Sequence, residues 1–292
     1  DRLRPRLTAE NRLQLRWETF CSDAEPLIAH VLAGQDRPSL AFNDHTTSML
    51  LHPDVALQDR PFDQVADYPV TPFDAPRFLK KMADQARRAH VTPEDYVALL
   101  TSVWDRRAEV PADIARMAAL ARSHRAPMLS HDDTQAETRA YYRDQGATVA
   151  EFPMHERVLL AARKAGDPIV LGAPNAMRGG SHLGSPGAAE MIARGLCDIL
   201  ASDYFYPAML GAIVRLNADR VAPLPALWKL VSLNPARAMG LTDRGRIAPG
   251  QRADLLLLDW PEGHVPAPLR TWVSGRTGYS ALPSVSETEP AL

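Results

Sequence analysis

Residues 127–172 read PMLSHDDTQAETRAYYRDQGATVAEFPMHERVLLAARKAGDPIVLG. Three short apolar runs in this stretch are typical of β-strands, and they cover Pro127–His131, Ala147–Glu151 and Pro168–Gly172. The two segments between them, Ala136–Gln145 and Glu156–Lys164, carry apolar residues at helical spacing. Strands that alternate with helices in this way favour a parallel sheet or barrel of the α/β class.

The same alternation continues on both sides of this stretch. Further strands are predicted over Leu13–Glu18, Leu40–His45 and Asp198–Asp203, and further helices over Ala188–Leu196 and Leu210–Asn217. Thr92-Pro93-Glu94 is typical of a helix start, with Tyr96, Leu99, Leu100 and Val103 as its apolar face. Another helix is predicted where apolar residues recur at i, i+3, i+4 and i+7, at Ile114, Met117, Ala118 and Ala121.

Two regions depart from this alternation. The segment His52–Pro76 contains five prolines and is expected to be an irregular insertion between the second and third strands. After residue 240 the turns Asp243-Arg244-Gly245 and Pro249-Gly250 lead to short strands over Ala253–Leu258 and Thr271–Arg276. We therefore expect a partial α/β barrel over residues 1–239, part of a small β domain over 240–279 and a frayed tail over 280–292.

Composition and charge exclude several classes of protein. The 33 Lys and Arg residues against 35 Asp and Glu give a net charge of -2, so no basic field is available for nucleic acid. No apolar run approaches the roughly 18 residues of a membrane span, and no signal peptide precedes residue 12. Two cysteines fit a reducing cytoplasm. The sequence leaves both a monomer and a homo-oligomer open.

Residues with metal-binding side chains stand at the ends of four predicted strands. They are Glu18, His45, His131 and Asp203. In parallel α/β folds the carboxyl ends of the strands meet at one rim, and a mixed nitrogen and oxygen set suits zinc, with manganese or iron as alternatives. We expect the four side chains to converge on one divalent ion. A carboxylate at the end of the buried strand before Asp203 needs a partner to offset its desolvation.

Each of these residues also has a plain structural interpretation. A lone histidine at a strand end is more often only hydrogen-bonded. Glu18 shares a strand face with Arg16 and can form an ion pair with it, and Asp203 can cap a segment that begins at Tyr204. For Asp132 and Asp133 the default role is to cap the following helix.

A glycine-rich segment, residues 172–184, follows another predicted buried strand and contains several hydrogen-bond donors. Arg178 offers a bidentate fork, Gly179 and Gly180 allow close approach of the backbone, and His182 is a possible acid. Together with Asn175 and Ser181, these residues are predicted to bind an anion. The alternative is a flexible turn.

Several of these motifs resemble the amidohydrolase superfamily. Residues 234–241, NPARAMGL, and 244–255, RGRIAPGQRADL, resemble its carboxyl-terminal signature. Three more segments, Ser130–Asp133, residues 172–182 and Ser202–Pro207, are similar to the diphosphatases of the carbon–phosphorus lyase pathway within it, and Glu151–Pro153 and Arg12–Glu18 also fit. The resemblance extends to about Gly278, and the glycine-rich segment is its most specific part.

The resemblance implies a TIM-like barrel and a metal-dependent hydrolysis of a phosphorylated sugar. It implies Glu18, His45 and His131 as metal ligands, and Asp203 as ligand and general base. The reaction would release diphosphate from a ribose triphosphate that carries a methylphosphonate, with Arg178 and His182 stabilising the leaving group. The family's first-strand histidine pair has no counterpart ahead of Glu18, so we expect a barrel that lacks its early strands.

Two other functions remain open on these residues. A deaminase or cyclic amidase of the same superfamily would use the same ligands, but it would not need Arg178 beside a glycine-rich segment. An inactive fragment is the third alternative, because a set of ligands without the first-strand pair holds metal poorly.

Overall fold

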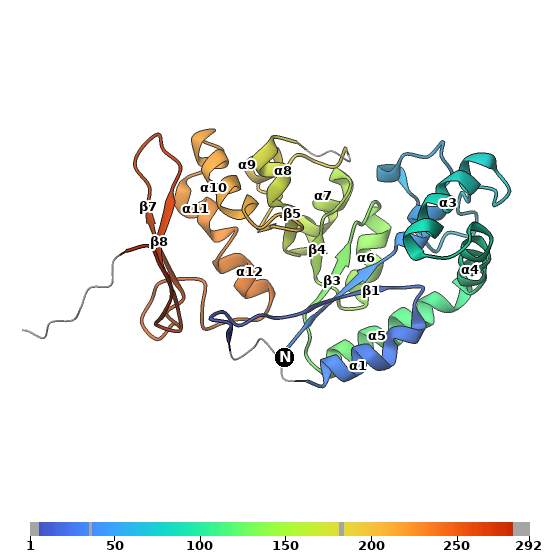
Figure 1. Cartoon of the computed structure of the whole chain (residues 1–292), viewed down its shortest axis with the longest axis horizontal. Helices are drawn as coiled ribbons and strands as arrows, with labels where there is room; N and C mark the ends of the chain where they lie inside the picture. Colours follow the sequence, from blue (N-terminus) through green and yellow to red (C-terminus); the bar gives the residue numbers. More distant parts are fainter. Residues whose placement is uncertain (1–5, 35–36, 181–183, 283–292) are drawn as a thin grey trace, which may run out of the picture.

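The computed structural model describes residues 6–34, 37–180 and 184–282. Its main feature is a six-stranded parallel sheet whose strands follow one another in chain order. The strands are β1 (Gln14–Glu18), β2 (Ser39–Asn43), β3 (Met128–His131), β4 (Val149–Glu151), β5 (Ile169–Gly172) and β6 (Ile199–Ala201). All six predicted strands are confirmed, although β2 and β6 each end two residues earlier than expected. The edges of the sheet are β1 and β6 (Figure 1).

Helices connect the strands, and most of them cover the outer face of the sheet (Figure 1). They are α1 (Glu25–Leu32), α2 (His45–Leu50), α3 (Pro76–Ala89), α4 (Pro93–Asp105), α5 (Val110–Ser123), α6 (Ala136–Asp144), α7 (Glu156–Ala165), α8 (Ala173–Arg178), α9 (Ala188–Ala193), α10 (Ala208–Ala218), α11 (Leu224–Lys229) and α12 (Leu233–Ala238). The expected fold class, α/β with a partial TIM-like barrel and a small β unit, is confirmed. No helix in the described part of the chain is long and apolar enough to cross a membrane.

Side chains that alternate along the strands form two cores. On the outer face, Trp17 and Phe42 pack against α5, whose predicted apolar positions Ile114, Met117, Ala118 and Ala121 are all buried. On the inner face, Ala41, Leu129, Val149, Val170 and Ile199 form a thinner apolar layer, against which α12 packs through Ala238. The strand pattern of period two therefore separates an apolar outer layer from an inner face that carries the polar strand ends.

The segment between β2 and β3 is the largest insertion in the sheet. Its irregular part, predicted over His52–Pro76, includes one isolated bridge between Leu51 and Val70 and then gives way to the helical pair α3 and α4. Thr92 caps α4 as predicted, because its hydroxyl accepts a hydrogen bond from the backbone N–H of Asp95 at 3.1 Å. Leu99 was expected on the buried face but is 60% exposed, so only part of that pattern packs.

A separate antiparallel sheet follows residue 240. It consists of β7 (Leu255–Asp259), β8 (Ala267–Val273) and β9 (Arg276–Ser280). The expected single strand over Thr271–Arg276 is wrong, because Ser274 and Gly275 both have positive φ and turn the chain between β8 and β9. Ser280 ends β9, whereas the rest of the predicted tail from residue 283 lies outside the described residues. The proposed domain boundary at residue 239 stays a prediction.

The chain before β1 contacts this small sheet. Glu10 forms ion pairs with Arg252 at 2.9 Å and Arg244 at 3.4 Å. The hydrogen bonds from Arg12 and then from Arg252 lower the pKa of Glu10 to about 2. Residues more than 230 positions apart in sequence are therefore held together beside the sheet.

Candidate active site

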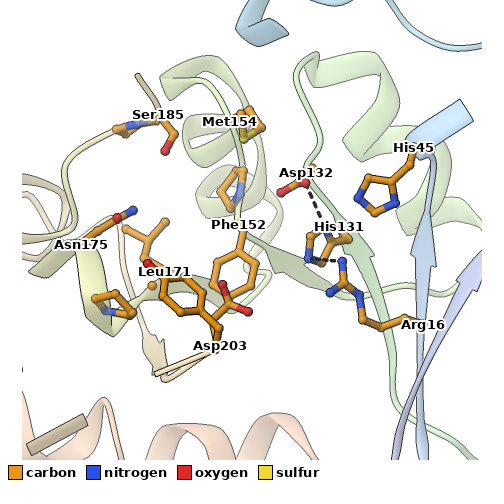
Figure 2. Close-up of a pocket in the computed structure, with 15 residues that line it drawn as sticks. Arg16, His45, His131, Asp132, Phe152, Met154, Leu171, Asn175, Ser185 and Asp203 are labelled. Carbon is orange, nitrogen blue, oxygen red and sulfur yellow. Dashed lines mark hydrogen bonds and ion pairs between the residues drawn. The ribbon is translucent and has the colours of Figure 1, made fainter. Parts of the chain in front are cut away.

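The carboxyl ends of the six strands surround one pocket of about 210 Å³. Figure 2 shows side chains from several strand ends pointing into it. Polar groups reach it from Arg16, His45, His131, Asp132, Asn175 and Asp203. Three of the four predicted metal ligands thus line the same pocket, which agrees with the expectation that function lies at this rim.

Glu18 and His45 form a tight pair at the ends of β1 and β2. The His45 backbone N–H donates to Glu18 Oε2 at 3.0 Å, and a second hydrogen bond joins His45 Nδ1 to Glu18 Oε1. Burial raises the pKa of Glu18, but the hydrogen bonds from His45 outweigh it, so this pKa lies below its ordinary value. The bond to Glu18 raises the pKa of His45. The expectation that His45 ends a strand is wrong: β2 ends at Asn43, and His45 is the first residue of α2, with Asp44 as its N-cap.

His131 is the last residue of β3, as predicted, and its imidazole is largely buried. Its Nδ1 lies 3.2 Å from Asp132 Oδ2, and Arg16 Nη2 lies 3.2 Å from its Nε2. Glu151 Oε2 lies 3.9 Å from the same Nε2. The rings of His45 and His131 are 6.3 Å apart, centroid to centroid.

The sequence analysis did not single out three polar residues at this rim: Arg16, Asn43 and Glu151. Arg16 does not pair with Glu18; its guanidinium donates to Asn43 Oδ1 at 3.2 Å. Glu151 is 7% exposed, accepts a hydrogen bond from Gln14 at 2.8 Å through Oε1, and has no partner for Oε2 among the described residues. Burial raises the pKa of Glu151. The sequence contained a signal for Glu151, because this residue ends a predicted strand just as His131 does. In the structure the two residues are paired in register between β3 and β4.

Asp203 lies two residues beyond β6 and differs from both interpretations made for it. Its side chain is exposed, so the desolvation argument for a required partner is wrong. It does not cap a helix either, because α10 begins at Ala208 and has Pro207 at its N-cap. Its backbone has φ of 48°, a left-handed conformation that is uncommon outside glycine. In the view of Figure 2 Asp203 lies across the pocket from His45.

The four predicted ligands therefore lie along one rim of the sheet. Glu18 contacts His45, His45 lies beside His131, and Asp203 stands on the pocket wall near β6. Within residues 6–34, 37–180 and 184–282, no three His, Cys, Asp or Glu side chains are grouped closely enough to hold one ion. The four-ligand site stays a prediction.

The glycine-rich segment is not a loop at its start. Residues Ala173–Arg178 form the short helix α8, with Pro174 in its first turn, and Gly179 ends it with φ of 89°. Asn175 lines the pocket, whereas Arg178 stands at the far end of α8 and donates to the Tyr204 hydroxyl at 3.1 Å. A Cβ on Gly179 or Gly180 would meet nothing of the described protein within 4 Å, and the approach of an anion to their backbone stays a prediction. Ser181 and His182 lie outside the described residues.

The aspartates after His131 do not cap α6, whose N-cap is Gln135. Asp133 is buried, accepts a hydrogen bond from Ser130 and lies 3.6 Å from the Arg139 guanidinium. Burial raises the pKa of Asp133. Asp132 turns the chain with φ of 58° and faces His131. Both residues therefore fix the β3 end of the pocket.

The remaining wall of the pocket is apolar. Phe152, Met154, Leu171 and Pro174 line it, and the Phe152 ring meets the His131 ring edge-on at 5.4 Å between centroids. The pocket thus combines one imidazole-rich polar side with one side that suits a flat or apolar group.

This arrangement of a parallel sheet, a small antiparallel sheet and a histidine and carboxylate rim agrees with a family match. The chain matches the amidohydrolase family over residues 6–279, and it belongs to that family.

Two curated relatives match parts of the chain. Over 151 residues the chain is 42% identical to alpha-D-ribose 1-methylphosphonate 5-triphosphate diphosphatase of Escherichia coli K12, a match that covers 51% of this chain and 40% of the relative. Over 187 residues it is 32% identical to an adenine deaminase of Methylobacterium sp. 4-46, covering 62% of this chain and 32% of the relative. The chain thus matches less than half the length of these relatives.

Among solved structures, N-acetylglucosamine-6-phosphate deacetylase from Pasteurella multocida aligns with a TM-score of 0.49 and 11% identity. That alignment covers 93% of this chain and 77% of the other.

Proposed function

We propose that the protein to which this chain belongs is a metal-dependent hydrolase that releases diphosphate from alpha-D-ribose 1-methylphosphonate 5-triphosphate. The single observation that carries the proposal is the 42% identity to the diphosphatase over half of the chain. The position of Asn175 in the pocket and of Arg178 at the end of the same helix supports it, because both offer donors to phosphate oxygens.

Imidazole and carboxylate groups at the rim are of the type that a divalent ion prefers, although no three of them are grouped closely enough within the described residues to hold one ion. Glu151 Oε2 is a buried oxygen without a hydrogen-bond partner among the described residues, and its 3.9 Å separation from His131 Nε2 lies within the span of two ligands that each bond one ion at roughly 2.0–2.2 Å. We propose that the predicted ligands Glu18, His45, His131 and Asp203 hold zinc, with manganese or iron as alternatives. When bound, such an ion activates water for attack and polarises a phosphoryl oxygen.

The chain's own residues would perform the remaining work. Asp203, exposed to the pocket, would accept the proton of the attacking water. Arg178 and Asn175 would bind the phosphate chain, with Gly179, Gly180 and Ser181 beside them, and His182 would protonate the leaving diphosphate. Phe152 would exclude water from the His131 side.

The test is diphosphate release from the ribose triphosphate by the purified protein, measured after chelation and after titration with zinc. We expect activity that disappears with the chelator and returns with about one to two equivalents of metal. Metal-independent release, or none from a folded and metal-loaded protein, would contradict the proposal.

A second candidate function is deamination of a nucleobase. It is favoured by the apolar wall at Phe152, Met154 and Leu171, which suits a planar ring, and by the identity to adenine deaminase. Ammonia release from adenine, with no diphosphate release from the triphosphate, would select this alternative.

A further inference from the structure

The guanidinium of Arg60, in the insertion between β2 and β3, is buried and contacts the residues that flank the two pocket histidines. Arg60 is 5% exposed. Its Nη1 donates to the Asp44 backbone carbonyl at 2.8 Å and to the Ser48 hydroxyl at 2.6 Å. Its Nη2 donates to the Asp132 backbone carbonyl at 3.3 Å. The two arms of one planar group therefore contact two segments that are 88 residues apart.

Each of the two carbonyls belongs to the immediate neighbour of a pocket histidine. Asp44 precedes His45, and Asp132 follows His131. The Asp44 carboxylate also lies 3.7 Å from Arg60, which partly balances the buried charge. The start of α2 and the turn after β3 are thus attached to the same rigid group.

Arg60 is itself fixed at its main chain. Its carbonyl accepts hydrogen bonds from Thr134 Oγ1 at 2.6 Å and from Gln135 Nε2 at 2.8 Å. Both donors lie in the turn that leads from His131 into α6. The main chain of Arg60 is therefore held in place by hydrogen bonds. The turn that provides them is the same turn that the guanidinium binds.

We propose that Arg60 is a positioning residue that sets the separation and orientation of His45 relative to His131. The guanidinium is planar and presents its two nitrogens at a fixed spacing, so it can hold both carbonyls at once. An ammonium group can satisfy the charge, but it is a single point and cannot span the same two acceptors. The inference concerns the geometry of the rings and does not depend on which substrate the pocket takes.

The test compares Arg60→Lys with a matched control, Arg107→Lys. Arg107 also binds backbone carbonyls with its guanidinium, but these belong to Asp63 and Val65, both within the insertion. Ring nitrogen shifts of His45 and His131 are measured by long-range ¹H–¹⁵N NMR and assigned with His45→Gln and His131→Gln. We expect both rings to change in Arg60→Lys and neither to change in Arg107→Lys.

A kinetic measurement on the same variants separates positioning from general stability. We expect kcat for diphosphate release to fall roughly tenfold to a hundredfold in Arg60→Lys, with KM nearly unchanged, because a displacement of about 1 Å is enough for such a loss. If no variant or wild-type protein releases diphosphate, the proposed function fails and the ring shifts alone decide the role of Arg60.

A milder variant keeps the inference testable if Arg60→Lys does not fold. Thr134→Val removes the hydroxyl bonded to the Arg60 carbonyl and leaves the guanidinium in place. We expect smaller changes of the same sign in both rings. A folded Arg60→Lys or Thr134→Val protein in which neither ring changes, or only His45 does, would overturn the proposal.

Discussion

Asp63 has a buried carboxyl group, and its surroundings disfavour the charged form of that group. It is 3% exposed, and its Oδ1 has no hydrogen-bond partner in the described part of the chain. Burial, and then the nearby charge of Asp44, raise the pKa of Asp63 to about 7. The folded state therefore holds a proton here that the unfolded state, with a pKa near 3.8, releases. The contribution of Asp63 to the free energy of unfolding is most favourable below about pH 4, and it falls as the pH rises towards 7.

Replacing Asp63 with Asn should remove this pH-dependent penalty. We expect Asp63→Asn to raise Tm by about 2–4 °C at pH 8, equivalent to about 1 kcal/mol for a chain of this size, and to leave it unchanged at pH 4. Thermal unfolding at both pH values is the measurement, and the exposed Asp74→Asn is the control. An equal gain at both pH values would show that the amide acts by packing and not by charge.

Arg178 is the residue on which the phosphate assignment depends. It contacts the Tyr204 hydroxyl, and its guanidinium lies 5.9 Å from the centre of that ring. We expect Arg178→Lys to lower kcat/KM for diphosphate release about ten- to a hundredfold, because the bidentate fork is lost while the charge stays. Steady-state kinetics of the two proteins is the check. Arg194→Lys, an exposed change on a surface ion pair, should leave the kinetics as they are.

Single residues at the rim were predictable where they end a strand. His131 was identified because it ends a short apolar run typical of a strand, and the same rule applied to Glu151 would have identified it too. Arg16 was not predictable as a contact of His131, because the two are 115 residues apart and no local pattern relates them. The exposure of Asp203 could not be read from the burial of the strand before it.

At the level of single elements, α4 depends on its cap. Thr92 supplies the hydroxyl that accepts from the Asp95 backbone, and α4 packs mainly on α3 and buries few residues. We expect Thr92→Ala to destabilise the helix by about 1 kcal/mol. Amide hydrogen exchange in the first turn of α4 should show the loss locally.

Ser102→Ala is the matched control for this change. Ser102 lies in the middle of α4, and its hydroxyl bonds the Leu99 carbonyl. Alanine has the higher helix propensity there, so exchange should stay the same or slow. Faster exchange along the whole of α4 in Ser102→Ala would mean that side-chain bonds in general, and not the cap, hold the helix.

Elements were predicted best where apolar spacing and boundary signals agreed. The buried face of α5 and the Thr92-Pro93 start of α4 met both conditions. The short helix α8 was missed because glycines flank it on both sides, at 172, 179 and 180, although Pro174 is a usual helix-start residue. The β8–β9 hairpin was missed because the strand predicted over Thr271–Arg276 included the two-residue turn Ser274-Gly275.

For the whole molecule, Glu10 joins the beginning of the described chain to the small sheet. We expect Glu10→Gln to weaken this attachment and to speed proteolytic cleavage in residues 6–12, while the global Tm changes little, because exposed ion pairs contribute about 0–1 kcal/mol. Since the pKa of Glu10 is lowered, the attachment should hold above pH 4.5 and be lost as the pH falls towards 2.

Limited proteolysis at pH 7, in low and high salt, measures this attachment. Glu262→Gln is the control, because Glu262 lies in an exposed turn with no ion pair in the described structure. Equal cleavage rates for wild type and Glu10→Gln would show that packing alone holds the segment. The sequence could predict the six strands of the sheet, but not this contact, because nothing local relates Glu10 to Arg252.

Residues with a left-handed backbone conformation at the rim place thermal stability and the proposed catalysis in conflict. Asp132, Phe152 and Asp203 have φ of 58°, 52° and 48° just after three strands, where glycine would be relaxed. A library selected only for thermal resistance should therefore enrich glycine at 203, the site whose side chain is exposed. We expect Asp203→Gly to unfold about 1 kcal/mol less readily than Asp203→Ala, and both to lose turnover. Heat selection would then discard the Asp203 side chain, to which we assign the transfer of the water proton.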